Sequence, residues 1–350
     1  MENNTLRKKK VVIVVHEALP VGPTFDLRRY LLEHSVDRLL HISHPLIYLK
    51  EFYKKSSYYE YHKRGKIVEK KTAFHWRLPD VFLYIKDFLY SVVWCLAKNE
   101  KYNLYVGADP LNALAGIALK KLGRVDKVVY HSIDYFTQRF ENKMLNRVYH
   151  FIDKLCVKFS DETWNLSSMM INARQAYNNI DPETSRQVTV PVGVWFKKVE
   201  RKPFNRIHKK KVVFIGSFVP MMGIDLILKA VPFIVKAVPE AKFEFIGSGP
   251  SDQTLRGIAK KLKLDKHITF HGWVYDRKKL GEILSDGAVG LAPFNTIILD
   301  DQVRNADPAK LKDYMLWGMP VIVTDAISNA KEIEEARCGI VIRYNLGELR

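Results

Sequence analysis

A lysine in an unusual position is the first residue whose type and spacing suggest chemistry. The segment Asp307-Pro308-Ala309-Lys310 predicts a helix with Asp307 as its N-cap and Pro308 as its first residue. Lys310 then falls in the first helical turn, where a cation opposes the helix dipole and stability alone would not select it. A phosphate group of a ligand is a plausible reason for a lysine there.

Asp313 follows Lys310 by three positions, so the two side chains project from one face of the predicted helix. A carboxylate and an ammonium on one face could hold a ribose diol and a phosphate together. A simple ion pair within the helix is the alternative, and the spacing alone does not decide between them.

Two glycine turns precede this helix. Phe214-Ile215-Gly216-Ser217 leads through Gly223 into one helix, and Gly247 ends the next strand in a tight loop. Glycine lets a backbone approach a phosphate closely, and the N-terminus of a helix supplies partial positive charge. A turn that needs glycine for its own geometry would look the same, so each turn is only suggestive.

Alternating strand and helix patterns must position these residues. In the first half we expect strands at residues 11–15, 103–107 and 127–130, and helices at 26–34, 81–98 and 110–122. After residue 205 the pattern restarts, with strands at 212–216, 242–247, 267–271, 287–292 and 319–324, and helices at 224–238, 251–262, 277–285 and 308–317. The prediction is an α/β protein with two Rossmann-like, doubly wound parallel-sheet domains, residues 1–200 and 201–350, that bind ligands in a cleft between them.

The order of motifs from Lys211 to Ile342 resembles the C-terminal domain of family-4 retaining glycosyltransferases, the group 1 type with the GT-B fold. The glycine turns, the strand end Pro293-Phe294 and the segment from Pro308 to Val321 follow in the family's order over about 130 residues. The stretches YHSIDYFTQRFENKMLNRVYHFIDKLC, DETWNLSSMM and VPVGVWF resemble a subgroup of the family. The resemblance implies a nucleotide-sugar donor in the second domain, held by Gly216, Ser217, Gly223, Gly247, Pro293, Phe294, Lys310 and Asp313.

The sequence differs from the family at the residues that bind the donor diphosphate. Many members carry Arg and Lys in the first glycine turn, where this chain has Ser217 and Met222. The family's paired glutamates correspond to Asn305 and Asp313. Either Lys310, Lys312 or Arg304 takes over the diphosphate, or activity is weakened or lost.

The same resemblance implies an acceptor side in the first domain. His16 follows the first strand, and Gly22 is the one glycine left where members have a pair. His131 and Asp134 follow the strand at 127–130, where an imidazole or a carboxylate could act as catalytic residue by orienting the acceptor hydroxyl or the transferred sugar. Asp134 occupies the subgroup's Asp-Tyr motif, whereas a hydrogen-bonded structural role would also explain His131.

Amino-acid composition limits the class of protein, its cellular compartment and its binding partners. Hydrophobic residues make up 47% of the 350 residues, enough for two cores, and three distant cysteines fit a reducing cytosol. The net charge of +18 suits nucleic acid, anionic lipid or phosphorylated substrates. The basic stretch 54–71, with interleaved tyrosines, could stack bases, lie on an anionic membrane or be a solvated loop.

The apolar segment at residues 81–97 offers two interpretations. It predicts a helix half-buried in a domain core, or one that also touches a bilayer surface. The residues that would make the second contact are Phe82, Leu83, Tyr84, Phe88, Leu89 and Trp94.

The resulting hypothesis is a cytoplasmic hexosyltransferase, peripheral at the inner face of the plasma membrane, in cell-envelope polysaccharide biosynthesis. Its donor is a nucleoside diphosphate sugar and its acceptor a glycan or lipid-linked glycan, with no metal, no cofactor and no nucleic acid. The alternatives are a non-catalytic binding subunit of the same fold and a nucleotide-sugar epimerase, which would need paired histidines and glutamates not evident here. Because members continue beyond the position of Arg350, we also expect a truncated chain.

Overall fold

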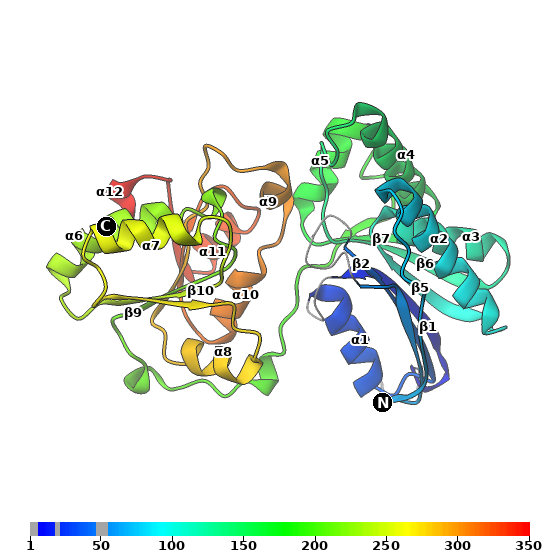
Figure 1. Ribbon diagram of the computed structural model, residues 1–350, viewed down its shortest axis with the longest axis horizontal. Coiled ribbons are helices and arrows are strands. Elements are labelled where there is room, and N and C mark those ends of the chain that lie inside the picture. Colours follow the sequence, from blue (N-terminus) through cyan, green and yellow to red (C-terminus); the bar gives the residue numbers. More distant parts are fainter. Residues whose placement is uncertain (1–5, 18–21, 47–54) are drawn as a thin grey trace. The chain divides into compact units, whose positions relative to one another are not determined.

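The computed structural model describes residues 6–17, 22–46 and 55–350, in two compact units (Figure 1). The first unit comprises residues 1–191 and the second residues 192–350, so the chain divides after residue 191 rather than at the expected 200. Each unit has its own sheet and its own buried core.

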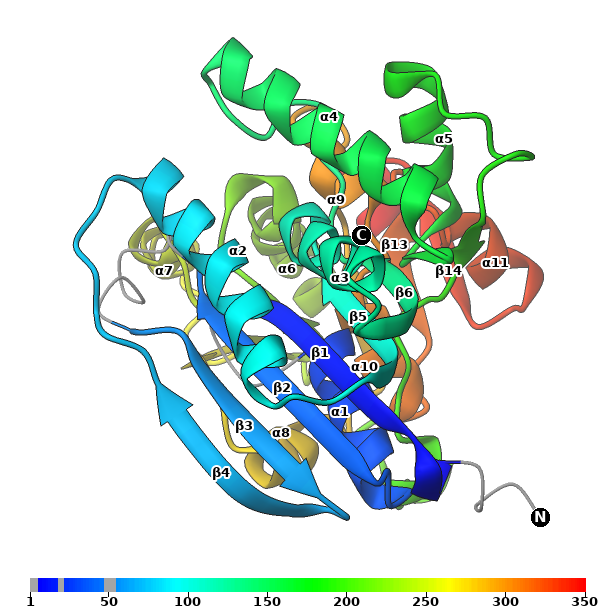
Figure 2. The same ribbon diagram turned by 90° about the vertical axis from the view of Figure 1, so that its right-hand side faces the viewer.

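The first unit contains an eight-stranded sheet in the order β4-β3-β2-β1-β5-β6-β7-β8. Its strands are β1 (Lys10–Glu17), β2 (Arg38–Pro45), β3 (Tyr58–Lys63), β4 (Lys66–Thr72), β5 (Tyr102–Ala108), β6 (Val125–Ser132), β7 (Glu162–Asn165) and β8 (Gln187–Thr189). Its helices are α1 (Pro23–Glu33), α2 (Asp80–Ala97), α3 (Pro110–Lys121), α4 (Lys143–Phe159) and α5 (Ser168–Asn178). Figures 1 and 2 show α2, α3 and α4 on one face of this sheet and α1 on the other.

This first sheet is parallel except at one edge, where it has a feature that the sequence did not predict. β3 and β4 form an antiparallel hairpin that adds to β2 at the sheet edge. Arg64 and Gly65 both adopt positive φ, 47° and 81°, as a tight two-residue hairpin turn requires. The hairpin uses the basic stretch that could have been a loop, and Tyr59 and Tyr61 are buried in it. These two tyrosines are therefore not available to stack bases.

The second unit contains a six-stranded, wholly parallel sheet in the order β11-β10-β9-β12-β13-β14. Its strands are β9 (Lys211–Ile215), β10 (Lys242–Ile246), β11 (Ile268–Gly272), β12 (Val289–Ala292), β13 (Val321–Thr324) and β14 (Gly339–Ile342). Its helices are α6 (Ile224–Ala237), α7 (Asp252–Lys261), α8 (Arg277–Leu284), α9 (Asp301–Asn305), α10 (Ala309–Leu316), α11 (Ala330–Glu335) and α12 (Leu346–Leu349).

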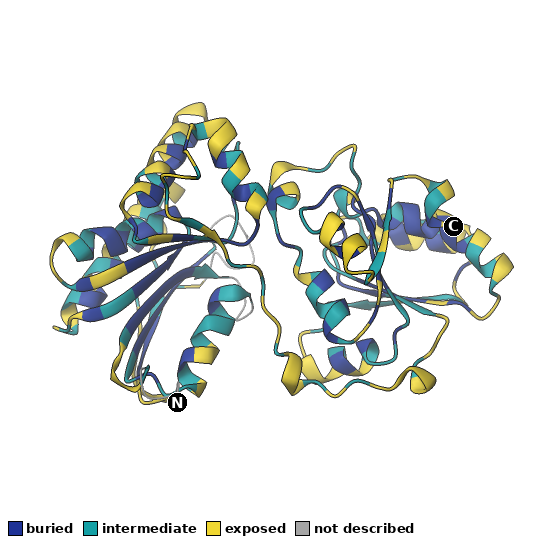
Figure 3. Ribbon diagram, turned by 180° about the vertical axis from the view of Figure 1, so that it is seen from behind, coloured by how far each residue is buried: buried dark blue, intermediate teal, exposed yellow. Residues whose placement is uncertain are grey.

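Two apolar clusters cover the faces of this second sheet. α6 and α7 pack on one face around Phe214, Phe243 and Phe245, and α8, α10 and α11 pack on the other around Val213 and Val323. The central strands β12 and β13 are mostly buried, the edge strands β11 and β14 are only partly buried, and the outer helix surfaces are exposed (Figure 3). The doubly wound arrangement predicted for this half is confirmed, and its strands end where Gly216 and Gly247 interrupt the apolar runs.

The apolar helix expected at residues 81–97 is α2, and it is half-buried in the core as the first interpretation predicted. Leu83 and Trp94 are buried, whereas Phe82 and Leu89 are more than half exposed. Leu83 and Trp94 thus could not contact a bilayer, which corrects that part of the second interpretation. No helix in the described part of the chain is long and apolar enough to cross a membrane.

Candidate functional site

The ammonium of Lys310 lies among uncharged groups beside the carboxyl end of β9. Lys310 is in the first turn of α10, as predicted, and its Nζ donates a 3.3 Å hydrogen bond to Sδ of Met222. The same Nζ lies 4.5 Å from the ring centroid of Phe214 and 4.9 Å from that of Phe294. Although the residue as a whole is half-buried, this surrounding desolvates the ammonium and lowers its pKa to about 7.

No carboxylate of the described residues forms an ion pair with Lys310, Asp313 included. The ion pair within the helix that the spacing allowed is therefore not formed. Asp313 lies half-buried on the same helix. A desolvated cation without a counter-ion is unfavourable, so the site gains free energy when an anion arrives.

Tyr314 fixes the position of α10, one turn beyond Lys310. Its hydroxyl donates to the carbonyl of Leu291 in β12 at 3.0 Å and accepts from the amide of Ile215 in β9 at 2.8 Å. Gly290 leaves room for the ring, because a Cβ there would lie 2.3 Å from Cγ of Tyr314. Tyr314 thus anchors α10 to two neighbouring strands, and the i, i+4 spacing places Lys310 on the same face.

The three glycines predicted for this site have different reasons to be glycine. Gly216 has a φ of +143°, and a Cβ on it would lie 2.9 Å from Nζ of Lys310. At Gly247 a Cβ would lie 1.9 Å from the backbone oxygen of Gly216, and at Gly223 it would lie 1.8 Å from that of Pro293. Packing of the protein's own backbone therefore explains Gly223 and Gly247, while Gly216 gives access to the lysine.

The remaining residues predicted to bind the donor lie near Lys310 at the ends of β9 and β12. Pro293 and Phe294 are buried directly after β12, where the carbonyl of Phe294 accepts a 2.9 Å hydrogen bond from Thr324. Ser217 follows Gly216 and is half-buried. The structure thus brings together Gly216, Met222, Pro293, Phe294 and Lys310.

Asp307 does not cap α10, which corrects the predicted helix start. The N-cap position is Pro308, and Asp307 accepts a 2.7 Å hydrogen bond from the amide of Val192 instead. Nζ of Lys312 lies 3.2 Å from the other oxygen of Asp307. Lys312, one of the cations considered for the diphosphate, already has a carboxylate partner.

His131 and Asp134 lie at the carboxyl end of β6 in the first unit. His131 is buried with its ring edge-on to Trp164 at 5.9 Å, and burial lowers its pKa to about 4. Neither ring nitrogen has a hydrogen-bond partner among the described residues, so His131 is not the hydrogen-bonded histidine considered above. Asp134 is half-buried in the following loop, where its carbonyl accepts from Ser132.

His16 belongs to a buried polar cluster that the sequence did not reveal. Its Nε2 lies 3.2 Å from a carboxylate oxygen of Asp87, and its Nδ1 accepts a 3.0 Å hydrogen bond from Asn112. His44 lies 3.2 Å from the other oxygen of Asp87, and Nζ of Lys86 lies 2.8 Å from it. Burial raises the pKa of Asp87, but the neighbouring His44 and His16 outweigh it and hold that pKa below its usual range.

This cluster brings together two histidines, a pairing that an epimerase would need. Burial lowers the pKa of His44, whose nitrogens also lie 2.9 Å from the hydroxyls of Ser57 and Ser91. Both histidines are thus engaged within the unit rather than directed at a ligand. Gly22, the other residue predicted for the acceptor, has a φ of +106° and precedes the first residue of α1.

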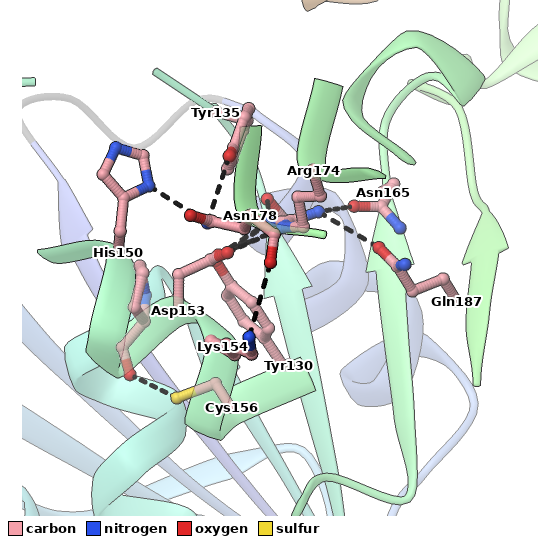
Figure 4. A network of polar contacts seen from close by, with 12 residues as sticks. Tyr130, Tyr135, His150, Asp153, Lys154, Cys156, Asn165, Arg174, Asn178 and Gln187 are labelled. Atoms are coloured by element: carbon pink, nitrogen blue, oxygen red, sulfur yellow. Dashed lines mark hydrogen bonds and ion pairs between the residues drawn. The ribbon is translucent and has the colours of Figure 1, made fainter. Parts of the chain in front are cut away.

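Residues from two of the three stretches that resemble the subgroup meet around Arg174 in a second polar network (Figure 4). Arg174 of α5 is fully buried and donates to both oxygens of Asp153 in α4, at 2.9 to 3.1 Å from Nε. Its other nitrogens donate to Ser132, at 2.7 Å, and to Asn165. The Tyr135 ring lies 4.7 Å from the guanidinium. These motif residues therefore stabilise the carboxyl ends of β6 and β7, next to His131 and Asp134.

Comparison with known proteins places the second unit in a family. Residues 209–348 match the family described as "Glycosyl transferases group 1", so the resemblance stated for this segment is confirmed. Protein CapJ of Staphylococcus aureus is 23% identical over 221 residues, 62% of this chain and 55% of that protein. A GDP-mannose-dependent alpha-(1-6)-phosphatidylinositol monomannoside mannosyltransferase of Mycobacterium tuberculosis is 34% identical over 74 residues, 21% and 19% of the two chains. The chain therefore spans about half the length of CapJ and about a fifth of the mannosyltransferase.

Solved structures establish the fold. TarM matches with a TM-score of 0.63 at 13% identity, over 99% of this chain and 91% of that one. Anabaena HepE, solved in complex with UDP and glucose, matches with a TM-score of 0.60 at 12% identity, over 97% and 87%. The fold is thus the GT-B fold of glycosyltransferases, as predicted. Retention and membership of family 4 stay predictions.

Proposed function

We propose that the chain is a glycosyltransferase that moves a hexose from a nucleoside diphosphate sugar to a glycan or lipid-linked acceptor. The observation that carries the proposal is the desolvated ammonium of Lys310, held beside Gly216 without a carboxylate. The family match of residues 209–348 supports the same function. Retention of configuration and the absence of metal and cofactor remain parts of the proposal.

The donor diphosphate would supply the counter-ion that Lys310 lacks. Charge builds up on the diphosphate as the sugar leaves, and a cation fixed in a desolvated site stabilises this charge more strongly than one in water. Since the pKa of Lys310 is about 7, an arriving diphosphate would also draw a proton onto the amine. Lys310 would thus do for the leaving group what Mg²⁺ does in other transferases.

On the acceptor side we retain His131 and Asp134 as candidates. The pKa of about 4 keeps His131 neutral, with a nitrogen able to accept a hydrogen bond from a hydroxyl. His16 is a weaker candidate because both of its nitrogens have partners. The name of the mycobacterial relative, which includes a phosphatidylinositol monomannoside, supports a lipid-linked acceptor.

A thermal-shift panel of UDP-, GDP- and dTDP-sugars tests the donor site. A matching nucleotide sugar should raise the melting temperature of the wild-type chain, since a ligand that binds only the folded state stabilises it. Lys310→Ala should abolish the shift, while Lys312→Ala, two residues along the same helix, should retain it. If no nucleotide sugar shifts the wild type, or if Lys310→Ala shifts as the wild type does, the donor proposal is wrong.

A non-catalytic binding subunit is the second candidate, and Met222 favours it. Its thioether contacts Lys310 at a position where many family members have a diphosphate-binding cation. Such a subunit would bind the nucleotide sugar without consuming it. Release of the free nucleoside diphosphate with a membrane extract as acceptor source separates the two: turnover identifies an enzyme, and binding without turnover a binding subunit.

A further inference from the structure

The outer face of α4 carries an apolar stripe that nothing in the first unit covers. Asn146, Tyr149, Asp153 and Cys156 face inward and are buried. On the opposite side Met144, Val148, Phe151 and Phe159 are 74%, 45%, 62% and 43% exposed. Their spacing of four, three and eight residues keeps them in one line along the helix, which has about 3.6 residues per turn.

Four cations of α4 follow this stripe and no anion of α4 does, although the exposed Glu141 lies just before the helix. Lys143, Arg147, Lys154 and Lys158 are exposed and recur at helical spacing, so they fall along one flank of the stripe. The single acidic residue of α4, Asp153, is buried against Arg174. Nζ of Lys158 and Nζ of Lys121 each lie 5.4 Å from the Phe159 ring centroid. The exposed face of α4 is thus apolar and basic only.

Helix α2 offers a useful contrast within the same layer of helices. It also exposes apolar side chains, Phe82, Ile85, Leu89 and Val93. Its lysine within this stretch, Lys86, is mostly buried and paired with Asp87 at 2.8 Å. The α2 stripe therefore lacks the free positive charge that accompanies the α4 stripe.

We propose that the exposed face of α4 lies flat on an anionic lipid bilayer. An exposed apolar stripe flanked by lysine and arginine is the pattern of helices that bind at a membrane interface. The apolar side chains would enter the headgroup region while the four cations contact lipid phosphates. A second copy of the chain fits less well, because a symmetric contact would place these cations against their own counterparts.

Flotation with lipid vesicles tests this surface without donor or acceptor, so its failure would leave the donor proposal intact. The full chain should bind phosphatidylcholine vesicles that contain phosphatidylglycerol and not vesicles of phosphatidylcholine alone. Each cation removed, as in Arg147→Gln and Lys154→Gln, should weaken binding about fivefold. Phe151→Ser should weaken it about tenfold, because an exposed aromatic anchor is lost.

The matched control is Phe233→Ser in α6, which removes another aromatic residue of similar exposure, in the second unit. Its vesicle binding should equal that of the wild type. Loss of binding in the α4 variants alone supports the proposal. Three outcomes would overturn it: no binding to anionic vesicles, equal binding by Phe151→Ser and wild type, or self-association that Phe151→Ser abolishes. Equal binding to a soluble polyanion such as heparin, insensitive to Phe151→Ser, would also overturn it by assigning the cations to a polyanion rather than a bilayer.

Discussion

Arg174 and Lys310 are both desolvated cations, and the protein treats them in opposite ways. Arg174 is fully buried in the first unit and has Asp153, Ser132 and Asn165 as partners (Figure 4). Lys310 in the second unit has two aromatic rings and a thioether around its ammonium. The first arrangement is complete within the fold, whereas the second lacks an anion. A buried charge that the fold leaves uncompensated is the better indicator of a ligand site.

The largest effect on stability should come from breaking the ion pair between Arg174 and Asp153. Arg174→Met should lower the free energy of unfolding by about 3–5 kcal/mol, because it leaves the Asp153 carboxylate buried without a cation. Urea denaturation measures this change. The double variant Arg174→Met/Asp153→Leu should recover much of the loss. If it is no more stable than the single variant, the ion pair is not the cause.

Replacing Lys310, whose ammonium has no anionic partner among the residues that the structure describes, by methionine should change the free energy of unfolding in the opposite direction. The folded pKa of Lys310, about 7, lies below that of an unfolded lysine, so the charge is a penalty that is complete below pH 7 and shrinks as the pH rises towards 10. Lys310→Met should therefore raise the free energy of unfolding at pH 6 by about 1–3 kcal/mol, and by less at pH 9. Lys312→Met, which loses an ion pair with Asp307, should not stabilise. If the Lys310→Met variant is less stable than wild type at pH 6, the Lys310 charge is not an uncompensated penalty in the folded protein.

A third and smaller effect should be the uptake of a proton by Lys310 when a nucleotide binds. At pH 8 the Lys310 amine is mostly neutral, and a bound diphosphate should restore its proton, so nucleotide affinity should fall by up to about tenfold per pH unit above 7. Titration calorimetry of UDP or GDP in two buffers of different ionisation enthalpy measures the uptake. Lys310→Arg should bind without uptake, because arginine stays charged. Equal uptake by this variant would place the titrating group elsewhere.

Gly216→Ala should have the smallest effect. Its Cβ would crowd only the flexible end of Lys310, at 2.9 Å from Nζ, so we expect nucleotide affinity to fall only by about threefold to tenfold, with a modest strain from the φ of +143°. Gly223→Ala is the control, since its Cβ would meet the fixed backbone oxygen of Pro293 and should destabilise the fold instead. Nucleotide titration and thermal unfolding of both variants separate the two roles. Similar effects of both variants would contradict the distinction.

The sequence predicted the second unit better than the first, for a physical reason. Glycines such as Gly216 and Gly247 interrupt short apolar runs, so five of the six strands of the second sheet could be located within a few residues, whereas β14 was not predicted. In the first unit β2, β3 and β4 carry histidines, tyrosines and charges that obscure the strand pattern. The sequence did not predict helix α4, although Asn142 caps it by accepting hydrogen bonds from the amides of Met144 and Leu145.

The candidate site around Lys310 was also predicted only in part. Lys310 could be selected because a cation in a first helical turn is unfavourable without a ligand. Its surroundings could not, because Phe214, Met222 and Phe294 come from separate parts of the chain that only folding brings together. His44, which joins His16 and Asp87, belongs to no motif and gave no signal.

The hairpin at the edge of the first sheet has a consequence for how the chain behaves when concentrated. β4 is an exposed edge strand whose outer backbone groups could pair with a strand of another molecule. Lys66 and Lys71, both exposed on β4, keep two such edges apart by charge repulsion. At about 1 M salt the screening length falls to about 3 Å, and this protection weakens. Concentrated preparations should therefore remain dispersed at low ionic strength and begin to associate, edge to edge, as salt is added.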